Sequence, residues 1–249
     1  MKTETEGLIL TDTAVGESDR LVTVLTRDSG IIRGFVRGAK NLKNLNFAST
    51  QPFSYSQLSI YKGKTSYVID ESRLIRSFYN VQFDLQRLAL AQYMCELAVR
   101  NIPENVYSSE ILDLMLNCLH VLTATDKPAG LVKTVFEIRF AVLSGSMPDI
   151  LYCSGCGKYD SETMFFEYEK NRLLCSDCVR EEQTVCMLSR GAVTAFRYIA
   201  LAEPKKIFSF TLSDTSLRQL SDCAEKYILS LSDTRFRTLD YYKQIQAFT

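Results

Sequence analysis

Alternating apolar and polar positions predict short β-strands over the first ~80 residues of the chain. The alternation or its flanking turn residues define five segments: 7–13, 19–26, 31–37, 53–61 and 65–69. Turn residues at Asp28-Ser-Gly30 and Lys62-Gly63 separate neighbouring segments. Five strands in so short a stretch predict a small closed sheet, such as a five-stranded β-barrel. The Asn-rich segment 38–48 is polar, and we expect it to be an exposed loop.

From about Val81 the apolar spacing changes to that of helices. The first helical segment, 83–100, is apolar on all sides, which predicts a mostly buried helix. Four more helices are predicted at 110–122, 126–143, 188–201 and 212–231. The fold class is therefore α+β, with a barrel domain at 1–79 followed by an α-helical domain at 80–249.

Composition narrows the class of protein. The 249 residues are 46% hydrophobic and 23% charged, as in ordinary globular proteins. No apolar run approaches the ~18 residues that span a bilayer, and Glu4 and Glu6 stand where a signal peptide needs basic residues. We therefore expect a cytoplasmic protein. In that reducing compartment its eight cysteines should be thiols or metal ligands rather than disulfides.

The charge is balanced over the chain but segregated along it. Lys plus Arg and Asp plus Glu each number 29. Residues 29–69 nevertheless contain no acid, and they contain six cations: Arg33, Arg37, Lys40, Lys43, Lys62 and Lys64. Such a segment attracts polyanions, because each neutralised phosphate releases condensed counterions. The alternative is a solvated surface that happens to lack acids.

Four cysteines form the one strong chemical motif. Cys153-x2-Cys156 and Cys175-x2-Cys178 are separated by 18 residues, so that two tight loops can present four thiolates to one metal ion. The intervening segment predicts a β-hairpin that turns at Lys170-Asn171, as in zinc ribbons. Four thiolates suit Zn²⁺ and fill its coordination shell, which predicts a structural site in a finger at about 150–186.

Other interpretations of the cysteines remain open. Two unrelated thiol pairs, a redox pair or an iron–sulfur centre would share the spacing. The remaining cysteines lie in or near apolar helical patterns and are expected to be core residues, with Cys186 the one nearest the motif: Cys95, Cys118, Cys186 and Cys223.

Catalytic motifs are missing from the sequence. His120 is the one histidine, on an apolar helix where a core or boundary position is expected. The chain has no phosphate-binding G-x4-G-K-[ST] loop, no G-x-S-x-G, and no deaminase pattern of H-x-E with P-C-x-x-C. We therefore expect a protein that is not an enzyme.

Three further features follow one another along nearly the whole chain. The first contains Glu17-Ser-Asp-Arg-Leu-Val22, Val36-Arg-Gly-Ala-Lys40 and Gln51-Pro-Phe53. The second is Phe136-Glu-Ile-Arg-Phe140 followed by Gly145 and Pro148, and the third is the four-cysteine motif. Together, in this order, they resemble the bacterial RecO family of recombination mediators.

The resemblance implies an oligonucleotide-binding (OB) fold barrel and a helical domain with an inserted four-cysteine zinc finger that holds one structural Zn²⁺. It also implies sequence-independent binding of single- and double-stranded DNA and annealing of complementary strands. The implied partners are RecR and the acidic tail of single-strand-binding protein (SSB), for loading the RecA recombinase. A nucleoid-associated location would follow.

Candidate DNA contacts lie in and near the acid-free segment. We expect Arg33, Arg37, Lys40 and Lys43 to contact phosphates, and Arg20 less firmly, because a local acid could pair with it. Four aromatics could stack on bases, although an interior or ordinary surface position is favoured for each: Phe47, Tyr55, Tyr61 and Tyr67.

Three other functions fit parts of the sequence. A zinc-ribbon transcription factor would discriminate between DNA sequences, an enzyme would need an unrecognised carboxylate site, and a structural protein would bind protein alone.

Overall fold

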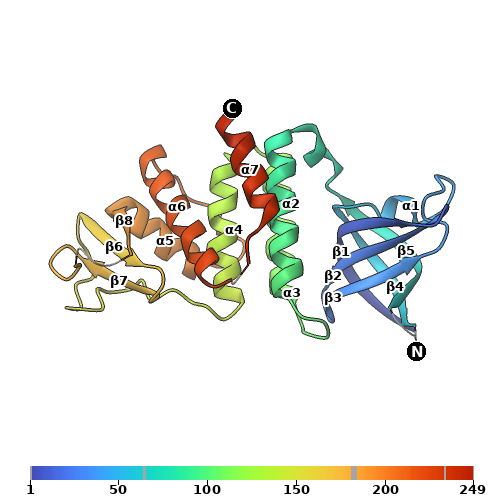
Figure 1. The fold of residues 1–249 in the computed structure, drawn as a ribbon, viewed down its shortest axis with the longest axis horizontal. Coiled ribbons are helices and arrows are strands. Elements are labelled where there is room, and N and C mark those ends of the chain that lie inside the picture. Colours follow the sequence, from blue (N-terminus) through green and yellow to red (C-terminus); the bar gives the residue numbers. More distant parts are fainter. Residues whose placement is uncertain (1, 64–65, 181–183, 233, 249) are drawn as a thin grey trace. The chain divides into compact units, whose positions relative to one another are not determined.

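The computed structural model describes residues 2–63, 66–180, 184–232 and 234–248, and it is mixed α+β (Figure 1). Contacts along the chain gather it into two compact units, residues 1–126 with 236–249 and residues 127–235. The sequence predicts a domain boundary between residues 79 and 80, where the pattern changes from strands to helices. The contacts instead group the first two long helices and the last helix with the barrel.

Five strands form the barrel: β1 Lys2–Val15, β2 Asp19–Thr26, β3 Gly30–Val36, β4 Ser54–Lys62 and β5 Tyr67–Ser77. They close in the order β1-β2-β3-β5-β4. Four joints are antiparallel, whereas β3 and β5 are parallel and share two residue pairs, Gly34 with Tyr67 and Phe35 with Val68. This short joint and strand number match the partly open OB-fold barrel, so the predicted fold is confirmed. β1 and β5 are longer than predicted.

The barrel buries apolar side chains on its inside and, along β1 and β2, on its outside as well. Its interior cluster is Ile9, Val22, Val24, Ile32, Val36, Ala39, Leu58, Ile60 and Ile69. Leu8, Leu10 and Leu25 alternate with interior positions and are equally buried, and α2 and α3 contact these two strands. Residues 8–10 are therefore continuously apolar, as expected of a strand covered on both faces.

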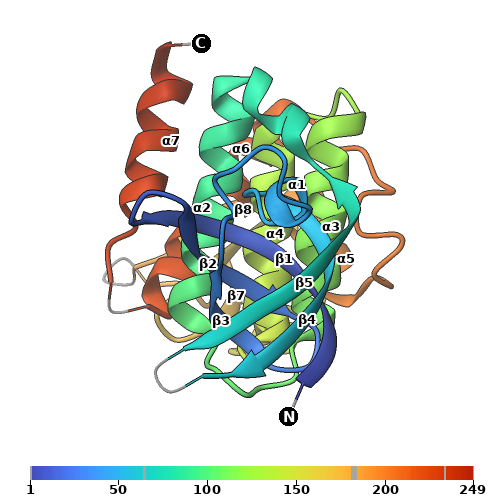
Figure 2. The ribbon, with the colours of Figure 1, turned by 90° about the vertical axis from the view of Figure 1, so that its right-hand side faces the viewer.

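Helices complete the first unit: α1 Asn46–Ser49, the 3₁₀ helix η1 Tyr79–Phe83, α2 Leu85–Asn101, α3 Ser109–Ala124 and α7 Arg237–Phe248. The short α1 lies in the segment predicted to be a loop and packs on β4 and β5 (Figure 2). The sequence pattern does not predict α7. This helix packs along α2, where the Thr238 backbone N–H donates to the Glu96 carboxylate at 3.0 Å.

The second unit joins three helices to a small sheet: α4 Ala129–Leu143, α5 Arg190–Leu201, α6 Asp214–Ser230, β6 Thr163–Glu167, β7 Arg172–Cys175 and β8 Cys186–Ser189. The predicted hairpin is β6–β7, and β8 adds a third strand beside β6. The helix expected from Leu188 begins later, because residues 186–189 are this strand. α5 begins after Ser189, whose hydroxyl accepts the Ala192 N–H and caps the helix.

α4 is buried along nearly its whole length between α5 and α6. Lys133 forms ion pairs of 2.9 Å with Glu137 and Glu225. Burial by itself would lower the pKa of Lys133, but the two carboxylates outweigh it and raise the pKa. Arg139 donates to the Ala200 carbonyl at the end of α5 at 2.9 Å. The charged residues of segment 136–140 therefore stabilise the core.

The turn between β2 and β3 docks on the segment that precedes α3. The Asn105 N–H donates to Ser29 O at 2.9 Å, and the Ser108 N–H donates to Arg27 O at 3.1 Å. Gly30 has a φ of +62°, and a Cβ there would lie 2.2 Å from the Pro103 carbonyl oxygen. A side chain at Gly30 would therefore force this contact apart.

We predict that Gly30→Ala lowers the free energy of unfolding by roughly 3 kcal/mol or more, measured by urea denaturation. Gly16→Ala is the matched control, because Gly16 has a φ of +57° but a Cβ added there would meet no atom within 4 Å. It should cost about 1 kcal/mol from backbone strain alone. Equal losses in the two variants would contradict the predicted clash.

Candidate functional site

The structure brings all four motif cysteines together. Their sulfur atoms lie within 4.8 Å of one another, and Cys156 Sγ and Cys175 Sγ are 3.6 Å apart. A regular tetrahedron of Zn–S bonds of ~2.3 Å separates its sulfurs by about 3.8 Å. The observed spacing therefore fits a single tetrahedral ion. We call these four residues the cysteine cluster.

Two glycines allow the first loop of the cysteine cluster to approach the second. A Cβ on Gly155 would lie 2.8 Å from the sulfur of Cys178. Gly157 has a φ of +74°, and its N–H donates to the Cys153 carbonyl at 2.8 Å, which closes the first loop. Lys158 and Asp177 pair at 2.9 Å between the two loops.

Backbone donors favour charge on one sulfur. Burial would raise the pKa of Cys153, but N–H groups of Cys175, Cys156 and Gly155 outweigh it and lower the pKa to about 6. The Cys178 thiol instead donates to the neighbouring sulfurs, which favours its protonated form and raises the pKa of Cys178 to about 12. Four thiolates this close need a cation to offset their mutual repulsion, so the donor set fits a thiophilic metal ion.

Arg197 of α5 holds the cysteine-bearing segment in place. Its guanidinium donates to the carbonyls of Ile150, Leu151 and Tyr159 at 2.7 to 2.9 Å, and it lies 4.3 Å from the centre of the Tyr159 ring. The side chain is buried, so these carbonyls have an internal donor instead of water. The sequence does not reveal this role, because a lone arginine in a helical pattern does not indicate which loop it contacts.

Arg33 and Arg37 are two exposed cations of the predicted basic surface. Arg33 points outward from β3, and Arg37 follows the end of that strand, four residues on and about 13 Å away. Both are exposed, and neither pairs with a carboxylate within the described ranges. We call these two residues the basic strip. Lys43 is likewise exposed, in the loop that follows.

Two predicted contacts have partners inside the protein. The Lys40 amine donates to the Gly16 carbonyl at 2.8 Å. Arg20 lies 3.3 Å from Asp12 and stacks on Phe47 at 5.2 Å from the ring centre. The structure thus separates these two cations from the exposed ones, and the local acid anticipated for Arg20 is Asp12.

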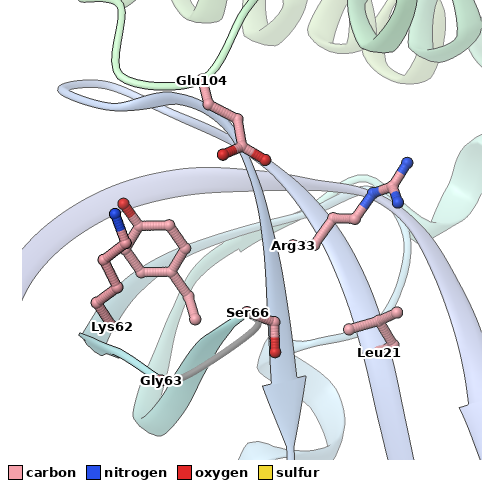
Figure 3. Close-up of a pocket in the computed structure, with 7 residues that line it drawn as sticks. Leu21, Arg33, Lys62, Gly63, Ser66 and Glu104 are labelled. Atoms are coloured by element: carbon pink, nitrogen blue, oxygen red, sulfur yellow. The ribbon is translucent and has the colours of Figure 1, made fainter.

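A hollow of about 450 Å³ lies beside the basic strip, between β2, β3 and the β4–β5 loop. Arg33 and Lys62 lie on opposite sides of it and Glu104 lies at its rim (Figure 3). Its lining is Leu21, Arg33, Lys62, Gly63, Ser66, Tyr67 and Glu104. OB-folds bind oligonucleotides through this strand face and this loop. Lys64, also expected to be basic surface, lies outside the described residues.

Comparisons with known proteins match both halves of the chain. The family model Recombination protein O N terminal matches residues 1–78, and Recombination protein O C terminal matches residues 82–240. A DNA repair protein RecO of Acetivibrio thermocellus is 31% identical over 242 residues, which cover 97% of this chain and 96% of that one. The chain belongs to the RecO family.

Two further RecO relatives agree with this assignment. The DNA repair protein RecO of Dehalococcoides mccartyi is 33% identical over 218 residues, covering 87% of this chain and 85% of the relative. That of Alkaliphilus metalliredigens is 25% identical over 246 residues, covering 98% and 100%. RecO membership supports a role in DNA repair and recombination. None of the helices described is both long and apolar enough to cross a membrane.

Several residues that carry the RecO resemblance have structural roles. Gly38 has a φ of +63° and its N–H donates to the Asp19 carboxylate at 2.7 Å, and Ala39 is in the barrel interior. Phe53 has a φ of +65°, and its N–H donates to Ile9 O at 2.8 Å. In the segment 36–40, only the Arg37 side chain is an exposed cation without a partner among the residues described.

Among the aromatic candidates, Tyr67 lines the hollow and Tyr61 is half-buried. The Tyr55 hydroxyl is hydrogen-bonded to Glu6 and Arg27, and Arg20 lies over one face of the Phe47 ring. All four cysteines outside the cluster are buried, as expected. The expectation for the single histidine is wrong: His120 is exposed on α3 and lies 2.7 Å from Arg76.

We predict that Arg197→Met lowers the free energy of unfolding by about 3 kcal/mol, because buried carbonyls lose their charged donor. Thermal and urea unfolding would measure the loss. Arg218→Met is the control, since Arg218 is an exposed residue of α6. Should the two variants unfold alike, the anchoring role of Arg197 would be wrong.

Proposed function

We propose that this RecO protein binds single- and double-stranded DNA without sequence preference, through the basic strip and the adjoining hollow, and anneals complementary strands. The observation that carries the proposal is the exposure of Arg33 and Arg37 without internal partners among the described residues, beside a hollow on the ligand-binding face of an OB-fold. Lys62, across the hollow from Arg33, and Lys43, in the loop after Arg37, add further exposed positive charge.

The proposed binding rests on phosphates. Cations that contact phosphates release counterions and read no sequence, which suits a protein that acts at any DNA break. Tyr67 lies at the hollow and offers a stacking surface for a base. The carboxylate of Glu104 repels phosphates, so the strand is expected to pass closer to Arg33 and Lys62 than to this rim.

Annealing by this route needs no catalytic group. Neutralising two backbones while leaving base edges free lowers the repulsion between the strands. We therefore propose that the protein is not an enzyme. RecR and the SSB tail are proposed as partners from family membership, in loading RecA onto SSB-coated DNA. RecA loading reconstituted from purified components tests this step.

We further propose that the cysteine cluster holds one structural Zn²⁺. Cys153, Cys156, Cys175 and Cys178 would be its ligands, and bound zinc would link the loop before β6 to the loop after β7. Four protein ligands leave no position for a substrate, so the ion would stabilise the fold and take no part in a reaction.

Arg33→Gln combined with Arg37→Gln should weaken binding of single-stranded DNA and slow annealing. The slope of log K against log salt should fall in magnitude by about 1.4, because two phosphate contacts are lost. Fluorescence anisotropy over a salt series measures the slope. Lys205→Gln with Arg218→Gln is the charge-matched control on exposed residues of the second unit. An unchanged slope in the first variant would remove the basis of the proposal.

Cys175→Ser should release the metal and lower the melting temperature, while folded protein at low temperature keeps its DNA affinity. A chromophoric chelator measures the zinc released on denaturation, and calorimetry measures the melting temperature. Cys186→Ala is the control, because Cys186 lies outside the cluster and should retain one zinc ion per chain. Loss of DNA binding at unchanged stability would contradict a purely structural site.

A further inference from the structure

Two leucines are almost fully exposed in the loop between β3 and α1. Leu42 is 79% exposed and Leu45 is 93% exposed. Apolar side chains held in water cost free energy that contact with a ligand recovers. We call residues 41–45 the leucine loop. The leucine loop begins four residues after Arg37, so it follows the basic strip along the chain.

Hydrogen bonds from three asparagines hold the leucine loop in shape. The Asn41 side chain accepts the Lys43 N–H at 3.0 Å, and the Asn44 side chain donates to Arg37 O at 3.1 Å. The Asn46 side chain accepts the Ser72 N–H on β5 at 2.9 Å. Ala39 anchors the start of the segment in the barrel interior. These hydrogen bonds fix the conformation of the loop in which the two leucines are exposed.

Two exposed cations accompany the leucines along the chain. Lys43 lies between them in sequence and Arg37 precedes them, both exposed. No Asp or Glu occurs from residue 29 to residue 69. A ligand that fits this loop therefore carries negative charge and apolar surface close together, so that residues 37–45 can contact both. An unpaired DNA strand has this combination, since each phosphate lies next to the flat face of a base.

We propose that Leu42 and Leu45 contact the faces of unpaired bases while Arg37 and Lys43 contact the adjoining phosphates. This inference rests on the proposed DNA binding and adds a salt-independent contribution to it. Apolar side chains enter base steps in other DNA-binding proteins, at the cost of unstacking. Unpaired bases avoid most of that cost, so the loop should favour single strands over duplex.

A lipid membrane also combines negative charge with apolar surface, but it fits the leucine loop less well than DNA does. Lasting attachment to a membrane takes a large apolar helix face or two lipid anchors, and two leucines supply far less apolar area. An acidic, apolar segment of a protein is the other alternative. Both are outcomes of the experiment below.

The test compares the full-length protein with Leu42→Ser/Leu45→Ser, using fluorescence anisotropy on an oligo(dT) strand and on an abasic deoxyribose-phosphate chain of equal length. Leu201→Ser/Leu231→Ser is the control, because these leucines are exposed in the second unit. The leucine-loop variant should fold normally, since the side chains it removes make little contact with the protein. A matching melting temperature checks this.

We expect the leucine-loop variant to bind oligo(dT) about tenfold more weakly, with an unchanged salt slope. Its affinity for the abasic chain should equal that of the wild type, and its preference for single strand over duplex should shrink. In the Arg33/Arg37 variant, by contrast, the slope of log K against log salt should fall in magnitude on both oligo(dT) and the abasic chain. These two signatures separate a failure of this inference from a failure of the proposed function.

Three results would overturn the inference while leaving the basic strip in place. Equal affinity of variant and wild type for oligo(dT) would exclude base contact. Equal weakening on the abasic chain would assign the loop to the backbone. Unchanged DNA binding, with loss of binding to phosphatidylglycerol vesicles or to an acidic SSB-tail peptide, would assign the loop to lipid or to protein.

Discussion

The contact of the β2–β3 turn with the segment before α3 is the constraint on which the first unit depends. Arg27, just after β2, donates to Glu6 at 3.2 Å, Asp113 at 3.1 Å and Ser109 at 2.7 Å. A hydrogen bond from Tyr55, with the charge of Arg27, lowers the pKa of Glu6, so this carboxylate remains ionised near neutral pH. The contact covers the start of β3 with the segment between α2 and α3, and Arg33 further along the strand remains exposed.

Within the part of the chain that the structure describes, arginine side chains are buried and hydrogen-bonded at two positions of the second unit, but exposed and without a partner at two positions of the first. Arg139 and Arg197 are buried, and each donates to backbone carbonyls of its own unit. The side chains of Arg33 and Arg37 form no ion pair or hydrogen bond among the described residues, although Glu104 lines the same hollow as Arg33. A buried guanidinium must be satisfied internally, whereas an exposed one remains hydrated until a ligand replaces the water. Solvent exposure and the lack of an internal partner are therefore better criteria for candidate DNA contacts than charge alone.

The sequence predicts the barrel, its strand number and the cysteine cluster, because each depends on local patterns. Period-two alternation and paired C-x2-C spacing are set within a few residues. It does not predict α7, whose apolar residues face α2 from far along the chain, or β8, whose four residues give too short a pattern. Helix α1 lies in an Asn-rich stretch whose composition favours a loop.

The roles of individual cations could not be predicted from the sequence. Arg20 and Arg33 belong to neighbouring strands and look alike in sequence, yet Arg20 lies near Asp12 of β1. That proximity depends on the register in which Ala14 lies opposite Arg20, which places Asp12 two residues along on the same face. Strand register is a tertiary property. A basic residue can be assigned to a ligand only after its neighbours across the sheet are known.

The balance of charge bears on the proposed annealing. A protein with 29 cations and 29 acids attracts DNA through a local surface rather than through net charge. A few phosphate contacts give binding that is fast to form and readily reversed as ionic strength or competing strands change. Annealing requires both properties, because the protein must first hold two strands and then leave the duplex. A more basic barrel would bind single strands more tightly but would also retain the product.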